Sequence, residues 1–462
     1  MRGACSAAKK PAWDQQDLDR RLCHALDIAR QAVERLASNG YTDSIEPGNS
    51  IRPEKLISET ALLLFAASTA GRHDTVGARI QGVAQLLIPH ARGERMLLGV
   101  CLEPALAWDY AQAHVCLSRL GYQDAAFDEM LQQSIDSQAK DGRERVPYRM
   151  LEQEWVSGNW NSSARRARGR TRPALSNSVL NRTMDVLNGS REDIYAFTHG
   201  LMYVRDFNVR PRRLPRGRSV ILAEAEAALA RCLDEQDYDL GGEVLLAWPL
   251  TGRSWNAAAA FGFRVLAAVE DKAGFLPAPN TRLKRLNELQ GDDRTNYLLA
   301  TAYHTAYVMG LLCAVALQQG RTPPAQIPTS GAIAGGASQV LTFLDACDRR
   351  AHWRDELQHL SDAERDALAG LLLTIALRQN ISRREFGTVR KLLEVGYAMG
   401  LADSPASGQA AEMLGRLSVY GNITRARGSK NQDKSDGTSP VGFALASASS
   451  PLREESALRS GE

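Results

Sequence analysis

The sequence predicts an all-helical protein, and three observations support this prediction. Apolar residues recur at helical spacing, as in the first segment with Leu18, Leu22 and Leu26. Runs of β-branched residues are short, so no segment has the composition of a strand. Short turns containing Gly or Pro separate one apolar pattern from the next. Successive helical hairpins indicate an α/α toroid or an α-solenoid, and we favour the toroid because no repeat of fixed length is present.

The predicted helices follow one another at short intervals along the chain. They cover residues 17–37, 53–65, 74–90, 95–120, 124–137, 146–156, 190–206, 219–233, 238–248, 255–271, 281–289, 296–319, 337–348, 362–378, 382–399 and 407–418. Pro53 occupies the first helical position, which proline favours. Asp124 is placed to cap the helix that follows it, and Ser361 with Glu364 has the spacing of a capping box.

We expect one folded domain, residues 17–419, between two disordered ends. Residues 1–16 contain Ala, Lys and Pro, and residues 420–462 are rich in Ser, Gly, Lys and Asp, a composition typical of disorder. An arginine-rich loop at residues 161–173 is inserted into the domain.

The overall composition excludes several classes of protein. Apolar residues make up 44% of the chain and the net charge is only +3, so the protein can bury a core and is not a polyelectrolyte. The seven cysteines are scattered without a CxxC pair, which is typical of reduced thiols. No apolar run is long enough to span a bilayer, and no secretory signal is expected. We therefore expect a cytoplasmic protein without a membrane partner.

The most informative segment is the helix predicted between Ser190 and Asp206. Ser190 is a favourable N-cap, and Asp193 three residues later can complete a capping-box-like pair. Polar residues at spacings of four and seven share one helix face: Tyr195, His199, Tyr203 and Asp206. Such a stripe among apolar neighbours is more consistent with the wall of a cavity than with a face in water.

A second polar segment opens the helix that follows Asp237, a residue well placed as an N-cap. Asp239 and Glu243 lie four residues apart on one face, where their like charges repel. Paired carboxylates serve where one stays protonated or where both hold a cation; the alternative is that they only favour the helix N-terminus. Gly241 and Gly242 each cost about 1 kcal/mol in a helix interior, which is typical of a close approach by a backbone or a ligand.

Further residues are candidates for the same cavity: Trp248, His304 and Tyr307. His304 lies next to an aromatic stripe on its helix, although a lone helical histidine is more often a satisfied core or interface residue. The five arginines between Arg165 and Arg172 could contact an anion, a carrier protein or a nucleic acid. Because no aromatic residues are interleaved with them, a solvated surface loop is the better interpretation, and nucleic acid is not expected as a partner. A second basic stretch, residues 205–218, has the same interpretation.

Several motifs are missing. The sequence has no HExxH, no CxxC, no Walker A or GxGxxG after a strand, and no GxSxG elbow. We therefore expect neither a metal site nor a cofactor.

Three segments together resemble an uncharacterised bacterial family of all-helical proteins. They are Pro147-Tyr-Arg-Met, the segment Ala196–Phe207 with its Thr-His-x-x-x-Tyr-x-x-Asp-Phe pattern, and the segment Gln236–Leu246. The resemblance covers about residues 18–318, and the arginine-rich loop and the C-terminal tail depart from it. It implies that the motif positions are His199, Tyr203, Asp206, Asp237, Asp239 and Glu243. Family members occur near genes for specialised metabolites, and no activity comes with the resemblance.

These observations favour an enzyme of specialised metabolism that binds a small organic substrate in a helical cavity. The reaction would be an acid–base cyclisation, elimination or isomerisation without a cofactor. The expected acid–base residues are His199, Asp206, Asp239 and Glu243. The expected substrate-binding residues are Tyr195, Tyr203, Asp237, Trp248, His304 and Tyr307. The alternative is a non-catalytic helical scaffold that binds a partner protein or an intermediate; a protein partner or a homo-oligomer is compatible with either.

Overall fold

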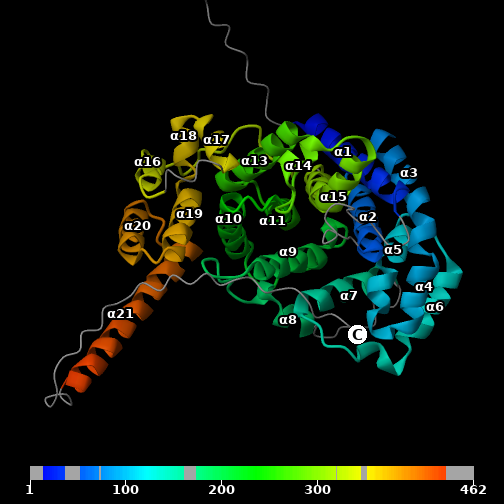
Figure 1. The fold of residues 1–462 in the computed structure, drawn as a ribbon, viewed down its shortest axis with the longest axis horizontal. Coiled ribbons are helices and arrows are strands. Elements are labelled where there is room, and N and C mark those ends of the chain that lie inside the picture. Colours follow the sequence, from blue (N-terminus) through cyan, green and yellow to red (C-terminus); the bar gives the residue numbers. More distant parts are fainter. Residues whose placement is uncertain are drawn as a thin grey trace, which may run out of the picture. The chain divides into compact units, whose positions relative to one another are not determined.

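The computed structural model describes residues 14–36, 52–71, 74–160, 173–318, 320–344 and 351–432 (Figure 1). These ranges contain helices and no β-strand, which confirms the predicted all-helical class. The chain divides into two units, residues 1–411 and residues 412–462. The predicted disorder of residues 1–13 and 433–462 lies outside the described residues.

The helices up to the centre of the chain are α1 (Gln15–Glu34), α2 (Pro53–Ala67), α3 (Asp74–Ala91), α4 (Glu94–Leu102), α5 (Ala107–Arg119), α6 (Ala125–Ile135), α7 (Pro147–Trp160), α8 (Pro173–Asn177), α9 (Arg191–Arg205), α10 (Arg218–Asp234) and α11 (Tyr238–Leu245). They are followed by α12 (Ala247–Thr251), α13 (Ala257–Ala273), α14 (Leu283–Glu288), α15 (Gly291–Ala316), α16 (Gly336–Leu341), α17 (His352–Gln358), α18 (Asp362–Asp366), α19 (Ala369–Ser382), α20 (Phe386–Ala398) and α21 (Pro405–Gln432). Short 3₁₀ turns lie between some of them, including Pro104–Leu106 and Asp206–Asn208.

Local sequence signals place most helix starts correctly. Pro53 begins α2, and the side chain of Asp124 accepts a hydrogen bond from Phe127 at the start of α6. The capping box at Ser361 and Glu364 is present and opens α18.

Several predicted boundaries are wrong. The helix predicted over 95–120 is two helices, because Glu103, before Pro104, leaves helical geometry with φ −122° and ψ 70°. The helix predicted over 362–378 is likewise interrupted between α18 and α19. At the other end of the chain, α21 continues to Gln432, so the segment that follows residue 419 begins as a helix.

Six helices surround the region that carries the predicted site. The helix α2 packs against α5, α5 against α7, α7 against α9, α9 against α11, α11 against α15, and α15 against α2. The order of contacts thus returns to its starting helix, as can be followed in Figure 1. On their other sides, α1 packs against α15 and α3, and α10 packs against α11 and α13.

The longest of the six, α15, is a core helix. Within the described residues it is the one helix with the length and apolar composition of a membrane span, but 89% of that apolar window is buried inside the fold. A helix that is apolar on all sides buries all sides. Its neighbours come very close: a Cβ built on Gly242 of α11 would lie 2.6 Å from Cγ1 of Val308. The glycine predicted to allow a close approach therefore lies at the contact between α11 and α15.

The end of α9 has an unusual backbone. Asp206, Phe207 and Asn208 have φ values of 49°, 46° and 65°, a left-handed conformation that costs free energy for residues other than glycine. Asp206 and Phe207 are buried, so surrounding contacts must hold this turn in place.

Candidate functional site

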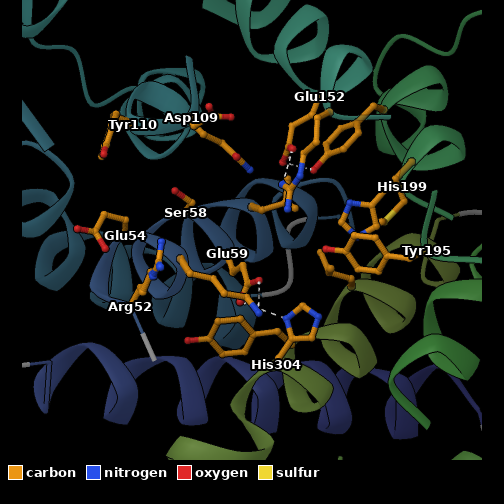
Figure 2. A pocket seen from close by; sticks show the side chains of 18 of the residues that line it. Arg52, Glu54, Ser58, Glu59, Asp109, Tyr110, Glu152, Tyr195, His199 and His304 are labelled. Carbon is orange, nitrogen blue, oxygen red and sulfur yellow. Dashed lines mark hydrogen bonds and ion pairs between the residues drawn. The ribbon is translucent and has the colours of Figure 1, made fainter. Parts of the chain in front are cut away.

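A cavity of about 890 Å³ lies among the six helices α2, α5, α7, α9, α11 and α15, each of which contributes side chains to its wall (Figure 2). Six of the residues predicted from the sequence line it: Tyr195, His199, Tyr203, Glu243, His304 and Tyr307. The periodicity argument for α9 therefore placed three residues, Tyr195, His199 and Tyr203, on the cavity side.

The helix α9 brings His199 to this wall. Its first turn is fixed by the predicted capping box, in which Ser190 and Asp193 exchange hydrogen bonds. The ring of Tyr195 lies against the imidazole of His199, with the ring centroids 3.8 Å apart. Nε2 of His199 lies 3.4 Å from Oε1 of Glu243, and Nδ1 is buried without a hydrogen-bond partner among the described residues. His199 is thus held between an aromatic ring and a carboxylate.

The helix α11 presents two carboxylates, each oriented through one of its oxygens. The hydroxyl of Thr198 donates a 2.6 Å hydrogen bond to Oε2 of Glu243. Arg191 donates to Oδ2 of Asp239 at 3.0 Å and to Oδ2 of Asp237 at 2.8 Å. Asp237 is the N-cap of α11, as predicted, because its side chain accepts from the backbone N–H of Leu240.

The helices α15 and α2 complete the cluster. Nε2 of His304 lies 3.4 Å from Oδ1 of Asp239 and 3.8 Å from Oε1 of Glu243. Nδ1 of the same ring lies 3.1 Å from Oε2 of Glu59 on α2, as the dashed line in Figure 2 shows. The hydroxyl of Tyr303 donates a 2.6 Å hydrogen bond to that oxygen of Glu59. One imidazole therefore faces three carboxylates.

Charges inside the cluster depend on one another. Burial opposes the charge of Glu59, but His304 lowers the pKa of its carboxyl to about 2. Burial also opposes ionisation of Glu243, and His199 nevertheless holds the pKa of that carboxyl well below its usual range. Burial disfavours the imidazolium of His304, but Glu59 and Asp239 outweigh it and raise the pKa of His304 well above its ordinary value. Burial raises the pKa of Asp239 despite the opposing effect of His304. The cluster thus retains positive charge among its carboxylates.

A second polar group lies on the α7 side of the cavity. The hydroxyl of Tyr203 donates a 2.7 Å hydrogen bond to Oε1 of Glu152, and Arg149 donates to the other oxygen at 2.7 Å. On the other side of the cavity, between α15 and α2, the hydroxyl of Tyr307 lies 2.9 Å from that of Thr60. Tyr203 and Tyr307 are therefore fixed by partners, and their rings form part of the wall.

Other predicted site residues lie elsewhere. Asp206 is not among the residues that line the cavity: the indole of Trp155 and the amide of Asn159 both donate to its Oδ1 at the end of α9. Trp248 is buried, and its ring stacks on Trp255 at a centroid distance of 6.4 Å. Asp237 acts as a helix cap and a partner of Arg191. The structure thus gives these three side chains partners outside the cavity.

Sequence reasoning missed three partners of the cluster. Glu59 lies between Ser58 and Thr60 and four residues after Lys55, a polar pattern typical of an exposed helix turn, so its sequence gave no signal of a buried partner. Arg191 is a cation in the first turn of α9, where the helix dipole disfavours positive charge, so a partner outside the helix could be expected. Thr198 gave no such signal, because threonine is common on helices.

Of the two arginine-rich stretches identified from the sequence, the structure describes only the second. Residues 161–172 lie outside the described residues. In the stretch 205–218, Arg205 donates to the carbonyl oxygens of Leu250 and Arg212, and Arg216 forms an ion pair with buried Glu224. Arg205 and Arg216 thus join this loop to the core, whereas Arg210, Arg213 and Arg218 are exposed.

Three atoms of the cluster have the chemistry of metal ligands. Asp239, Glu243 and His304 each offer one donor atom, and these atoms lie within 4.8 Å of one another. A cation was one of the two uses considered for the Asp239–Glu243 pair from sequence, although no metal site was expected.

The profile of a family described as a domain of unknown function, DUF6895, matches residues 18–314. The chain belongs to this family. Every residue that lines the cavity falls within the matched range, whereas α16–α21 lie beyond it. Comparison with curated proteins and with solved structures found no match. The cavity therefore lies within the part of the chain that matches the family, and its role must be argued from its own side chains.

Proposed function

We propose that this DUF6895 protein is an enzyme that transforms a small organic molecule in the cavity by acid–base chemistry. The observation that carries the proposal is the placement of His199 against Glu243, with Nε2 and Oε1 3.4 Å apart, in the wall of a cavity of about 890 Å³. Imidazole–carboxylate pairs in enclosed cavities are a common arrangement for proton transfer. The volume is within the range of small-molecule sites.

In this proposal His199 exchanges a proton with the substrate, and Glu243 compensates the charge of the imidazolium. The hydrogen bond from Thr198 fixes the carboxylate of Glu243, and the ring of Tyr195 fixes the plane of the imidazole. His304, whose Nε2 lies 3.8 Å from the same oxygen of Glu243, would supply a second proton donor. A base and an acid in one cavity suit a cyclisation, an elimination or an isomerisation, in which protons move without net oxidation or reduction. The biosynthetic setting, the synthesis of a specialised metabolite, rests on the resemblance described from the sequence.

The finer architecture belongs to the same proposal. We propose that α2, α5, α7, α9, α11 and α15 form the inner ring of an α/α toroid. Their closed order of contacts supports it, as does the packing of α1 and α10 on the outer sides of α15 and α11. Toroids of this kind place substrates at the centre of the ring, where side chains from several helices meet.

The test is a gene deletion complemented with wild type, His199→Asn, Glu243→Gln or the control His359→Ala, followed by comparison of metabolites. His359 is an exposed histidine at the end of α17, outside the cavity. We expect wild type and His359→Ala to restore a lost product, and the two cavity variants to lose it while a precursor accumulates. Each variant is checked for wild-type abundance and far-UV circular dichroism. Restoration of the product by folded His199→Asn and Glu243→Gln would favour a non-catalytic scaffold instead.

A further inference from the structure

We infer that Asp239, Glu243 and His304 bind a divalent transition-metal cation through Oδ1, Oε1 and Nε2. The inference concerns binding alone and does not require the proposed acid–base function. A cation was one of two uses considered for Asp239 and Glu243 from the sequence, and the structure adds His304 as a third ligand.

The spacing of the donor atoms supports the inference. Nε2 of His304 lies 3.4 Å from Oδ1 of Asp239 and 3.8 Å from Oε1 of Glu243, and all three atoms lie within 4.8 Å of one another. With metal–ligand bonds of about 2.1 Å, adjacent ligands lie about 3.0–3.5 Å apart. A cation between the three atoms thus requires shifts of a few tenths of an ångström at the two His304 contacts, while the oxygens of Asp239 and Glu243, which lie within 4.8 Å, would both turn toward it.

The residues that contact the three proposed ligands support the cation site independently of these distances. A metal-binding histidine usually donates its second ring nitrogen to a carboxylate, and Nδ1 of His304 faces Glu59 at 3.1 Å. The second oxygen of each carboxylate is also engaged: Arg191 donates to Oδ2 of Asp239, and Thr198 donates to Oε2 of Glu243. Each carboxylate is therefore held by a hydrogen bond to its outer oxygen, and Nδ1 of His304 lies within ion-pair distance of Glu59, which leaves the other donor atom of each side chain directed at the common point.

The burial of Asp239 gives a third argument for a bound cation. The residue is only 8% exposed, and among the described residues its Oδ1 accepts no hydrogen bond. A buried carboxylate oxygen without a donor is costly. Three carboxylates, Glu59, Asp239 and Glu243, surround His304. A divalent cation that displaces the proton from Nε2 adds one net positive charge at the point where Oδ1 is directed.

The donor set limits the kind of cation. Two carboxylate oxygens and one imidazole nitrogen, without a thiolate, suit Mn²⁺, Fe²⁺, Co²⁺ or Zn²⁺ better than soft ions, and the imidazole disfavours Ca²⁺ and Mg²⁺. Glu243 and His304 also line the cavity, so positions not filled by protein ligands would face a bound molecule.

The experiment uses the full chain, freed of metal with a chelator and then titrated calorimetrically with Mn²⁺ and with Zn²⁺. We expect one equivalent to bind wild type. Asp239→Asn and Glu243→Gln should weaken binding at least about tenfold, and Glu59→Gln about 10- to 100-fold through the orientation of His304. The matched control is Asp206→Asn, the same isosteric change at a buried carboxylate outside the cluster, which should bind as wild type does.

Two results would overturn the inference. One is the absence of stoichiometric binding of either cation to folded wild type, a result that needs no variant. The other is equal affinity in wild type, Asp239→Asn and Glu243→Gln. Co²⁺ added to wild type gives a further readout, since its visible spectrum reports nitrogen and oxygen ligands. The titration contains no substrate, so a failure to bind a cation would not contradict the proposed acid–base function. In the same way, a failure of the complementation test would not contradict the cation site.

Discussion

The indole Nε1 of Trp155 donates a 2.6 Å hydrogen bond to Oδ1 of Asp206, the residue that ends α9. Both residues are 1% exposed. Asp206 also begins three consecutive residues with left-handed backbone, so its side chain is fixed where the backbone is least favourable. We interpret Asp206 as a residue that holds the end of α9 in place, rather than as the catalytic acid that the helical stripe suggested.

This interpretation predicts different effects for two substitutions at one position. Asp206→Ala removes the acceptor and leaves the indole N–H buried, so the free energy of unfolding should fall by about 1–3 kcal/mol. Asp206→Asn keeps an acceptor oxygen and tolerates the left-handed backbone, so the loss should be smaller. Urea denaturation of both variants measures the difference. A folded Asp206→Asn variant that failed to restore the product would instead support a catalytic role.

Two adjacent arginines on α1 offer a second matched comparison. Arg21 is 1% exposed and pairs with Asp17, Glu270 and Asp271, whereas the side chain of Arg20 is 57% exposed and pairs with Asp17 and Asp271. Arg21→Ala leaves Glu270 buried without its cation, so we expect a loss of about 3–5 kcal/mol in the free energy of unfolding.

Arg20→Ala, in contrast, should change the free energy of unfolding by less than about 1 kcal/mol, because exposed ion pairs contribute little. Chemical denaturation followed by circular dichroism gives both values. Similar losses of unfolding free energy in Arg20→Ala and Arg21→Ala would mean that the burial of Arg21 does not determine how much it stabilises the fold.

The sequence predicted the parts of the site that depend on local structure. The spacing of Tyr195, His199 and Tyr203 fixes their common face once the helix exists, and the capping residue Ser190 fixes where the helix begins. The same spacing argument does not hold for Asp206, because α9 ends at Arg205 and the backbone of Asp206 is left-handed. Its side chain therefore leaves the face shared by Tyr195, His199 and Tyr203.

The remaining partners depend on tertiary packing. Glu59 meets His304 across 245 positions of sequence, through the contact between α2 and α15. No periodicity within one helix contains that information. Within α2, Glu59 has the spacing of an ordinary i,i+4 pair with Lys55, so the sequence does not indicate its buried partner.

If the cation site exists, metal should stabilise the fold. Binding to the native state alone adds about 2.7 kcal/mol at a free cation concentration of 100 times Kd. Thermal unfolding should therefore shift to higher temperature with Mn²⁺ or Zn²⁺ and return with a chelator. The Glu243→Gln variant should show a much smaller shift. An equal shift in that variant would attribute the effect to sites elsewhere.

Cysteine reactivity gives a prediction that is independent of function. Burial raises the pKa values of the Cys116, Cys232 and Cys313 thiols, so little reactive thiolate forms in the native protein. Cys101 is exposed. Brief alkylation at pH 8 followed by peptide mass spectrometry should label Cys101 well before these three thiols, and denaturation should abolish the difference. Rapid native labelling of Cys232 or Cys313 would indicate opening of the core.

The contact of Gly242 with Val308 determines how closely the helices that carry Asp239, Glu243 and His304 approach each other. A methyl group at position 242 would lie 2.6 Å from Val308, and relief of that overlap would move α11 away from α15. Asp239 and Glu243 belong to the first helix and His304 to the second, so their donor atoms would separate together. Substitution patterns across DUF6895 should reflect this dependence, so members that keep the three polar residues should keep glycine at the position of Gly242.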